Sequence, residues 1–397
     1  MSEKIQNGWK WVKLGEIVFI NSKNLTPNYP YDEIYYLDTG SVAEGRLISS
    51  YKKFYLKEAP SRAKRIVSDG DIVYSLVRPI QRHYIIIKNP PDNLIVSTGF
   101  AVITADNNKA DNRFIYYYLT LNEIVEYLDS IAEGSTTTYP SIVPDDLKNL
   151  IFPLPPLPEQ KAIAEVLSSI DDKIDLLHRQ NKTLEEMAMT LFRKWFIDAN
   201  FDGTIGQIVN VQGGYAFKSK DFKPDGNHSV IKIKNITNSI ININDTEFID
   251  ESVVKNLDIK FKIFSGDVLI AMTGAEIGKL GIVPKTNKNL WLNQRVGLLR
   301  DKYDGARFIA YLHLKSEFGY DYIINAASGS AQANISASDI ENCPFVQLSE
   351  DGIKAYSKTI NPFFEKIIFN LGQIQTLEKL RDTLLPKLMS GEVRIMK

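Results

Sequence analysis

A heptad pattern of apolar residues in the middle of the chain constrains the fold more than any other feature. Five residues recur at intervals of seven: Ile163, Ile170, Leu177, Leu184 and Leu191. The intermediate positions hold Val166, Ile174, Met187 and Trp195, with a polar gap at Gln180 and Asn181. The pattern predicts one helix over residues 158–198, roughly 60 Å long at ~1.5 Å per residue. Such a helix cannot bury its seam alone, so it needs a partner.

Four prolines precede this helix within the segment FPLPPLPEQ, at Pro153, Pro155, Pro156 and Pro158. Proline fixes φ and lacks an N–H donor, which suits an extended segment and the first turn of a helix. Pro158 followed by Glu159 therefore predicts the helix start, with a carboxylate near the positive end of the helix dipole. The segment before it predicts an extended connection that fixes how a globular part meets the helix.

A second apolar pattern near the C-terminus offers a partner. Its residues recur at spacings of three or four, at Ile360, Phe363, Ile367, Leu371, Ile374, Leu377, Leu380 and Leu384. An ordinary amphipathic helix packed on a domain would give the same spacing, but two such helices at matching places favour mutual pairing. The predicted seam of this second helix comprises Ile367, Leu371, Ile374, Leu377 and Leu384.

The chain also repeats itself, at offsets between 191 and 196 residues. The matches keep one order and pair Leu14–Ile17 with Ile205–Ile208, Ser68–Ile72 with Phe264–Val268, Arg113–Ile115 with Arg307–Ile309, and Thr183–Glu185 with Thr376–Glu378. Their shared order and nearly constant offset indicate two tandem structural units.

The predicted order is therefore globular domain, long helix, globular domain, long helix, at residues 1–155, 156–200, 201–348 and 349–397. Apolar runs after glycine turns predict strands, whereas residues 114–128 and 308–324 carry helical periodicity. We predict an α+β fold in which two tandem α/β domains are joined by two long antiparallel coiled-coil helices. A pseudo-twofold axis would relate the two halves.

Composition sets the broad class. The 397 residues exceed one ordinary hydrophobic core, and the net charge of −1 neither indicates nor excludes nucleic-acid binding. Cys343 is the only cysteine, which excludes a disulfide framework and a cysteine zinc site. The first residues lack a secretory signal, and no apolar run is long enough to cross a membrane, so we expect a cytoplasmic protein without membrane contact.

Three segments resemble catalytic motifs without completing them. Residues 89–92, Asn-Pro-Pro-Asp, lack the aromatic residue of amino methyltransferases, and residues 274–280 have the wrong glycine spacing for a phosphate loop. Residues 145–148, Asp-Asp-Leu-Lys, have no suitably spaced second acid for a nuclease. The four histidines are scattered, which excludes metal-ligand spacing. The sequence therefore predicts a non-catalytic chain with no metal site.

Several of these segments together resemble the type I restriction-modification specificity subunits. The segments are Pro153–Gln160 before the heptads, Leu191–Phe196 at the end of that helix, Gly266–Ile270, Asn293–Val296, and Leu380–Gly391. They follow the order of that family along the whole chain. Two departures are Ser97–Phe100, at the place of Asn293–Val296, and the absence of a proline-rich connection before the second helix.

The resemblance implies a division of labour. Each globular part would be a target recognition domain that reads one half of a split sequence in double-stranded DNA, and the helices would set the spacing. Two modification subunits would bind this scaffold and restriction subunits would join them. S-adenosylmethionine, ATP and Mg²⁺ would be bound by those partners, and this chain would hold no cofactor.

Residues 46–65 form a basic stretch with interleaved aromatics and one acid, Glu58. Basic side chains neutralise phosphates, which drives nonspecific DNA affinity. The candidates for phosphate contact are Lys52, Lys53, Arg62, Lys64 and Arg65. The alternative is a solvated surface in which the aromatic residues are core anchors. The equivalent stretch around residues 241–262 is more acidic than basic.

Base reading requires Arg, Asn, Gln, Ser or Thr side chains on adaptable loops. Two pairs of polar loops match between the repeats, although ordinary turns would look the same. The candidates in the first repeat are Arg78, Gln81, Arg82, Thr136, Thr137, Thr138 and Tyr139. Those in the second repeat are Thr273, Lys279, Arg295, Gln332 and Asn334.

Two other functions stay open from the sequence. The chain could be a coiled-coil scaffold for protein partners only, or an orphan subunit that binds modification subunits without recognising DNA. The helix between Lys161 and Asp198 is nearly neutral, which fits packing and partner docking better than phosphate contact. Specific binding of a bipartite DNA sequence by a reconstituted complex would exclude both alternatives.

Overall fold

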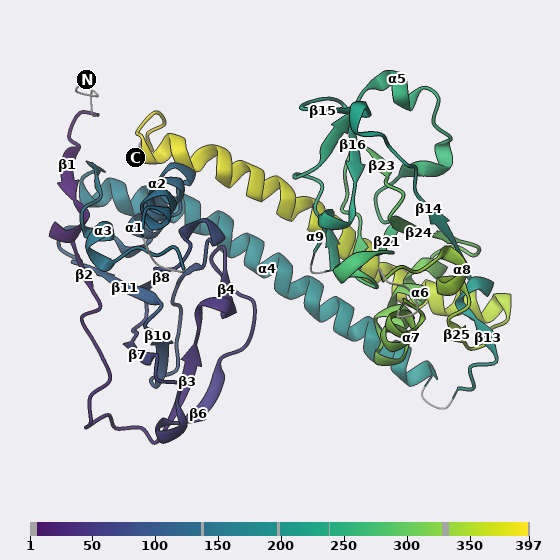
Figure 1. Cartoon of the computed structure of the whole chain (residues 1–397), viewed down its shortest axis with the longest axis horizontal. Helices are drawn as coiled ribbons and strands as arrows, with labels where there is room; N and C mark the ends of the chain where they lie inside the picture. The colour runs from purple at the N-terminus through teal and green to yellow at the C-terminus, as the bar shows by residue number, and fades with distance from the viewer. Residues whose placement is uncertain (1–5, 136–138, 197–198, 238, 328–332, 396–397) are drawn as a thin grey trace. The chain divides into compact units, whose positions relative to one another are not determined.

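The computed structural model describes residues 6–135, 139–196, 199–237, 239–327 and 333–395 (Figure 1). The chain divides into two compact units. Unit 1 comprises Met1–Asp172 and Lys379–Lys397, and unit 2 comprises Lys173–Glu378. No helix in the described part of the chain is long and apolar enough to cross a membrane.

Unit 1 is built on two four-stranded sheets. The first has the order β2-β11-β8-β9, with β2 (Val18–Ile20), β11 (Phe100–Ala105), β8 (Ile72–Ser75) and β9 (Tyr84–Ile86). The second has the order β6-β3-β10-β7, with β6 (Lys52–Tyr55), β3 (Glu33–Leu37), β10 (Leu94–Ser97) and β7 (Ala63–Ile66). Only β3 and β10 among these neighbours run parallel. A short hairpin of β4 (Val42–Ala43) and β5 (Arg46–Leu47) accompanies them.

Unit 2 repeats this plan with additions. Its six-stranded sheet has the order β14 (Val209–Gly213), β24 (Val296–Asp301), β21 (Val268–Ala271), β22 (Leu280–Ile282), β18 (Ser239–Ile241) and β17 (Ile236–Thr237). Its five-stranded sheet has the order β15 (Phe222–Lys223), β19 (Glu247–Ile249), β16 (His228–Ile231), β23 (Asn289–Leu292) and β20 (Lys262–Ile263). The strands β16 and β23 run parallel, as β3 and β10 do. The internal repeat predicted from the sequence is therefore confirmed by strand order.

The repeated Gly-Asp motif forms the same turn in both units. Gly70 and Gly266 have φ of +82° and +83°, where a side chain would be strained. Asp71 accepts a hydrogen bond from the backbone N–H of Ser68 at 2.7 Å, and Asp267 accepts one from Phe264 at 2.8 Å. This motif therefore shapes the entry to β8 and β21.

Each segment with helical periodicity forms two helices. They are α1 (Asn112–Leu119) and α2 (Asn122–Glu133) in unit 1, and α6 (Ala306–Lys315) and α7 (Glu317–Ala327) in unit 2. A hydroxyl bonds the preceding turn at each break, from Thr120 to the Tyr117 carbonyl and from Ser316 to the His313 carbonyl. The sequence pattern predicted the helical regions but not these interruptions. Three shorter helices are α3 (Pro144–Lys148), α5 (Glu251–Val254) and α8 (Ala337–Glu341).

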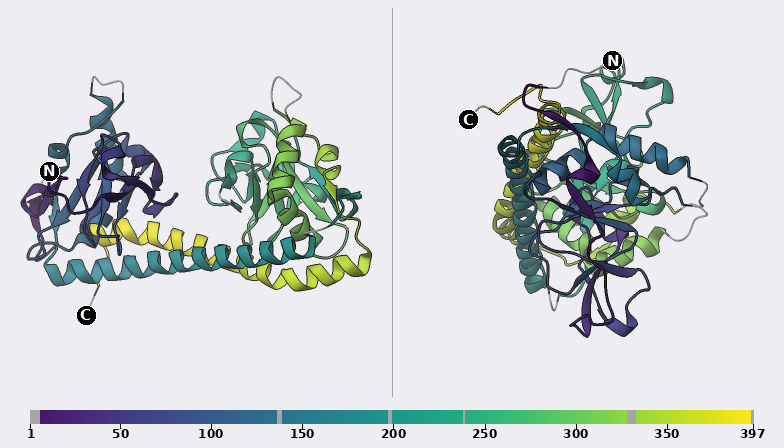
Figure 2. Two further views of the ribbon diagram at one scale, coloured as in Figure 1. Left: turned by 90° about the horizontal axis from the view of Figure 1, so that it is seen from below. Right: turned by 90° about the vertical axis from the view of Figure 1, so that its left-hand side faces the viewer.

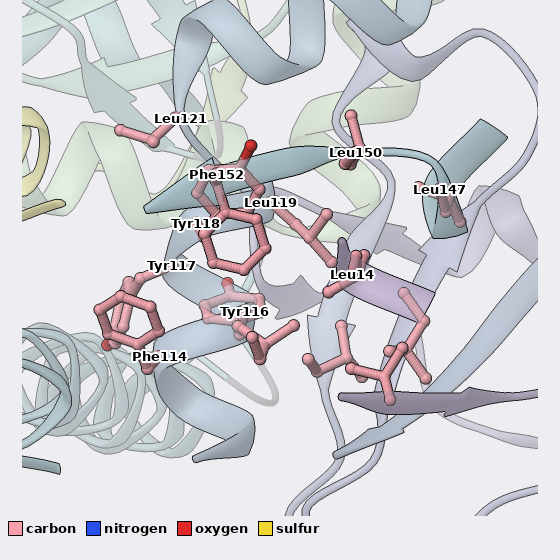
Figure 3. Close-up of a cluster of buried hydrophobic side chains, with 14 of the residues drawn as sticks. Leu14, Phe114, Tyr116, Tyr117, Tyr118, Leu119, Leu121, Leu147, Leu150 and Phe152 are labelled. Carbon is pink, nitrogen blue, oxygen red and sulfur yellow. The ribbon is translucent and has the colours of Figure 1, made fainter. Parts of the chain in front are cut away.

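The core of unit 1 joins α1 to the connection before the first long helix (Figure 3). The rings of Tyr118 and Phe152 stack with centroids 3.9 Å apart. Leu14, Leu119 and Leu147 are fully buried beside them. This cluster fixes the globular part of unit 1 on its own stretch of long helix.

The first part of the proline-rich connection is a β-strand. β12 (Ile151–Leu154) pairs antiparallel with β1 (Lys10–Lys13), and Trp11 faces Pro153. In unit 2, β25 (Pro344–Phe345) pairs with β13 (Gly203–Thr204) in the same manner. Proline is tolerated here because each ribbon has two strands, so every strand is an edge.

The first long helix, α4 (Leu157–Phe196), begins one residue before the predicted Pro158. Gln160 is buried in its first turn. Its amide donates to the carbonyls of Pro155 at 2.8 Å and Lys109 at 3.1 Å, and its oxygen accepts from the Asp111 N–H at 3.0 Å. Gln160 therefore ties the connection, the helix start and the N-cap of α1 together.

The second long helix, α9 (Glu350–Met389), runs antiparallel to α4 within each unit. In unit 1, Arg381 donates to Asp171 at 3.0 Å. In unit 2, Asn370 donates to Asn181 at 2.8 Å, and the rings of Trp195 and Tyr356 lie 4.5 Å apart. Figure 2 shows that the sheets of each unit lie on one side of its long helices.

The seam is buried where the helices face each other. Further along α4, a different set of residues is buried. The buried predicted positions are Ile163, Ile170, Leu177, Ile367, Leu371 and Ile374, whereas Leu184, Leu191, Leu377 and Leu384 are half-buried. Met187 is 47% exposed, so its predicted place in the seam is wrong. Phe192 is buried instead and stacks on Phe345, because this end of α4 packs against the globular part of unit 2.

Candidate DNA-recognition surface

The structure brings together two loops of unit 1 that lie some 60 residues apart in the sequence. Val77 pairs with Ser141 across an antiparallel bridge. The Arg78 N–H donates to the Pro140 carbonyl at 3.0 Å. The loop with Arg78, Gln81 and Arg82 therefore lies against the segment that begins at Tyr139. The predicted residues Thr136, Thr137 and Thr138 lie outside the described residues.

Part of the basic stretch reaches the same end of the sheets. The Leu76 N–H donates to the Gly99 carbonyl at 2.8 Å, and the Thr98 N–H donates to the Arg62 carbonyl at 2.8 Å. Thr39 also lies against Gly99, and its neighbour Asp38 contacts Lys52 at 2.7 Å. Arg62 and Lys52 therefore lie near the loop pair.

The other basic candidates of unit 1 lie further along the strands. Lys53 contacts Glu33 at 2.6 Å, and Arg65 donates to Asn24 at 2.7 Å. Lys64 is exposed on β7, and its carbonyl accepts from the Leu25 N–H. The hydrogen bond to Asp38 raises the pKa of Lys52, so this amine stays charged. Exposed ion pairs of this kind are weak and exchange readily for a phosphate.

The aromatic residues of the basic stretch divide between core and surface. Tyr51 and Phe54 are half-buried, and the ring of Phe54 lies 6.1 Å from that of Tyr36 in an edge-on contact. Tyr55 is 53% exposed. The structure therefore shows core anchors at two of the three aromatic positions.

Unit 2 repeats the loop pair with different side chains. Thr273 pairs with Asn334, and the Gly274 N–H donates to the Ala333 carbonyl at 3.0 Å. The Met272 N–H donates to the Arg295 carbonyl at 3.1 Å. These contacts bring three predicted residues to one end of the sheet, namely Thr273, Asn334 and Arg295. Gln332 lies outside the described residues.

Lys279 lies at the same end but is paired. Its carbonyl accepts from the Ala271 N–H, and its amine makes a close ion pair with Glu276. The unit 2 loop therefore contains a Lys–Glu ion pair within itself.

Sequence reasoning missed Tyr215, which is 37% exposed and pairs with Asn293. Its N–H donates to the Leu292 carbonyl at 2.8 Å, and its carbonyl accepts from Gln294. A Cβ at the preceding Gly214 would lie 2.1 Å from the Asn293 carbonyl oxygen, so only glycine permits this approach. The paired glycines before an aromatic residue were the available signal.

The Asn-Pro-Pro-Asp segment at residues 89–92 begins in a turn. Asn89 has φ of +47°, and its N–H donates to Asp69 at 2.6 Å, as expected for a turn. In the described part of the chain, no group of three His, Cys, Asp or Glu side chains could hold a metal ion. The surface instead offers Arg, Gln, Asn, Thr and Tyr side chains on loops, which suit the edges of bases in a DNA groove.

A polar cavity of about 530 Å³ lies beside the long helices of unit 1. Asp171 lines it and accepts from Tyr117 at 2.7 Å and from Arg381. Burial and the Asp171 carboxylate raise the pKa of Tyr117. Burial alone would lower the pKa of Arg381, but Asp171 and Asp382 outweigh it and raise that pKa. Arg381, within the C-terminal motif, therefore joins α9 to α4 and α1.

Comparison with known proteins gives a consistent result. A family model described as the type I restriction modification DNA specificity domain matches residues 6–186 and again residues 201–379. The HindI specificity subunit of Haemophilus influenzae is 26% identical, over 97% of this chain and 99% of that protein. The MjaIX specificity subunit of Methanocaldococcus jannaschii is 28% identical, over 99% and 90%.

A solved structure shows the same fold. The type I restriction-modification S subunit from M. genitalium superposes with a TM-score of 0.56 at 17% identity and covers 100% of this chain. The two family matches also confirm the two predicted tandem domains, and the helices and sheets of both units confirm the predicted α+β class. On this evidence the chain belongs to the family of type I restriction modification DNA specificity proteins, and it is a recognition subunit and not a catalytic one.

Proposed function

We propose that each unit reads one half of a bipartite sequence in double-stranded DNA. The observation that carries this proposal is the repeated loop pair, joined at Arg78 and Pro140 in unit 1 and at Gly274 and Ala333 in unit 2. The same backbone geometry carries different polar side chains in the two units. Two such surfaces would read two different half-sites.

The long helices would set the number of base pairs between the half-sites and dock the partner subunits. We propose two modification subunits per chain, joined by restriction subunits, as the resemblance to the family implies. S-adenosylmethionine, ATP and Mg²⁺ would be bound by those partners. A protein acting on chromosomal DNA with such partners would work in the cytoplasm.

Lys52, Arg62 and the exposed residues of the loop pairs would make the DNA contacts. Lys52 and Arg62 would neutralise phosphates beside the unit 1 loops, which positions the duplex without reading sequence. Arg295, Thr273 and Asn334 would contact base edges or sugar atoms in unit 2.

The test is reconstitution with the modification subunit encoded in the same genome. Methylome sequencing of cells that express both should show methylated adenine at one split sequence. The purified chain alone with S-adenosylmethionine should leave DNA unmethylated. A complex that assembles but methylates no specific sequence would support the orphan-scaffold alternative, and methyl transfer by the chain alone would exclude the proposed role.

A further inference from the structure

Arg78 occupies a backbone conformation that the repeat fills with glycine. Its φ is +46°, in the left-handed region that is unfavourable for a side chain with a Cβ. Its N–H donates to the Pro140 carbonyl, as the Gly274 N–H donates to the Ala333 carbonyl in unit 2. Gly274 has φ of +77°. The two residues are therefore structural equivalents, and unit 1 keeps an arginine where glycine is the unstrained choice.

Neighbouring contacts hold this conformation. The Arg78 carbonyl accepts from the Gln81 N–H at 2.9 Å, and Pro79 fixes the next φ. The Ile80 N–H donates to the Asp129 carboxylate at 3.1 Å. The loop is therefore anchored to α2 and to the Pro140 segment, which restricts where the Arg78 side chain starts.

The Arg78 guanidinium differs from the other charged groups of this loop. Arg78 is exposed, and it has no side-chain partner among the described residues. Arg82, four residues on, donates to Asn122 at 2.9 Å and lines the polar cavity. Lys52 is paired with Asp38. Arg78 thus combines an anchored backbone with an exposed side chain.

We propose that Arg78 reads a guanine in the half-site bound by unit 1, an inference that rests on the proposed function. Two parallel N–H donors of a guanidinium match the O6 and N7 acceptors of guanine in the major groove. Backbone strain is expected where a side chain serves binding, and Arg78 is strained, exposed and without a side-chain partner in the described part of the chain. Unit 2 has glycine at this position, so its loop lacks the contact.

The experiment uses the complete complex with its modification subunits and the target found by methylome sequencing. Each guanine of the unit 1 half-site is replaced in turn by 7-deazaguanine, which removes the N7 acceptor. We expect one replacement to weaken binding of the native complex by roughly 5- to 50-fold. The same replacement should not weaken binding further in the Arg78→Gly complex.

Arg78→Gly is a favourable variant because glycine fits the left-handed backbone. Its thermal unfolding temperature should equal or exceed that of the native chain. Arg78→Lys keeps the charge but replaces the planar fork of donors by a flexible ammonium, so it should retain nonspecific binding and weaken guanine discrimination. Unit 2 supplies the internal control, because deazaguanine effects in its half-site should be unaltered.

An Arg78→Gly complex that keeps native discrimination at every guanine of the unit 1 half-site would overturn the inference, as would a half-site without guanine. Both outcomes leave a bipartite target in place, so the proposed function would stand. A complex without any bipartite target would instead overturn the proposed function itself.

Discussion

Asn370 of α9 donates a hydrogen bond to Asn181 of α4 at 2.8 Å, at the polar gap in the heptad seam. Asn370 is fully buried. Two atoms of this pair have no hydrogen-bond partner among the described residues: the side-chain nitrogen of Asn181 and the side-chain oxygen of Asn370. One polar pair in an apolar seam fixes the register of two helices and lowers their stability.

Replacing both asparagines by leucine should therefore stabilise the chain. We expect the free energy of unfolding to rise by about 1–3 kcal/mol, because buried unpaired amide groups are removed. The single variant Asn370→Leu should destabilise, since it leaves the Asn181 amide without a partner. Denaturant unfolding gives the free energy of unfolding of the native chain, the single variant and the double variant. Lys182→Leu, on the exposed face of the helix, serves as control. A double variant less stable than the native chain would contradict this account.

Gln160→Leu should destabilise unit 1. The substitution removes three hydrogen bonds, a buried one to the Pro155 carbonyl and part-buried ones at Asp111 and Lys109, so we expect a loss of about 3 kcal/mol. Lys161→Leu, at the adjacent exposed position, should change stability by less than about 0.5 kcal/mol. Thermal and denaturant unfolding provide the comparison, and equal effects at both positions would refute the proposed clamp.

His313 should make unit 2 sensitive to acid. Burial lowers its pKa to about 4, and its Nε2 lies 2.8 Å from the Pro344 carbonyl. In the unfolded chain His313 binds a proton below about pH 6.5, whereas in the folded chain it does so only near pH 4. The stability contributed by neutral His313 is thus present above pH 6.5 and is lost as pH falls toward 4.

We expect native stability to fall by about 2 kcal/mol between pH 7 and pH 5 from this residue alone. The measurement is the free energy of unfolding of the native chain and of His313→Gln at both pH values. The two chains share all other titrating groups. The difference between their pH dependences of unfolding free energy therefore reports the contribution of His313. An equal pH dependence in both chains would show that the buried imidazole is not responsible.

Much of the architecture could be predicted from the sequence because it rests on repetition and periodicity. The offsets predicted two related units, and strand order confirms them. The breaks at Thr120 and Ser316 could not be predicted, since a hydroxyl bonded to the preceding turn leaves helical periodicity almost intact. Met187 was misplaced because the heptad cannot tell when a helix stops facing its partner and begins to pack against a sheet domain.

The candidate site was predictable only in pieces. Polar loops near Arg78 and Tyr139 were visible as separate segments, and only the tertiary fold joins them through Pro140. The charge of Lys53 is visible in the sequence, but its pairing with Glu33 is not. Tyr215 was missed because its exposure depends on contact between Gly214 and Asn293.

Lengthening both long helices at the boundary between the units should lengthen the gap between half-sites. An insertion after Asn181 alone would disrupt its contact with Asn370. We therefore place four residues after Asp172 in α4 and four after Glu378 in α9, near the Asp171–Arg381 contact. Four residues add roughly 6 Å and about one turn, so the buried faces stay nearly in register.

The nonspecific gap should then grow by one or two base pairs, at ~3.4 Å per base pair, while both half-sites stay the same. Paired two-residue insertions would rotate each helix by about 200° and should weaken assembly. Methylome sequencing reads the gap directly. An active four-residue variant with an unaltered gap would mean that the helices do not set the spacing.

The central claim is that each unit reads its own half-site, and exchange of one unit tests it most directly. Residues 14–150 of this chain are replaced by the matching segment of a relative, which leaves β1, β12 and the Gln160 side chain native. Methylome sequencing of cells with the exchanged chain and the modification subunit then gives the new target. We predict that one half of the target changes while the other half and the gap are retained. A target in which both halves change together, in an active complex, would contradict the claim.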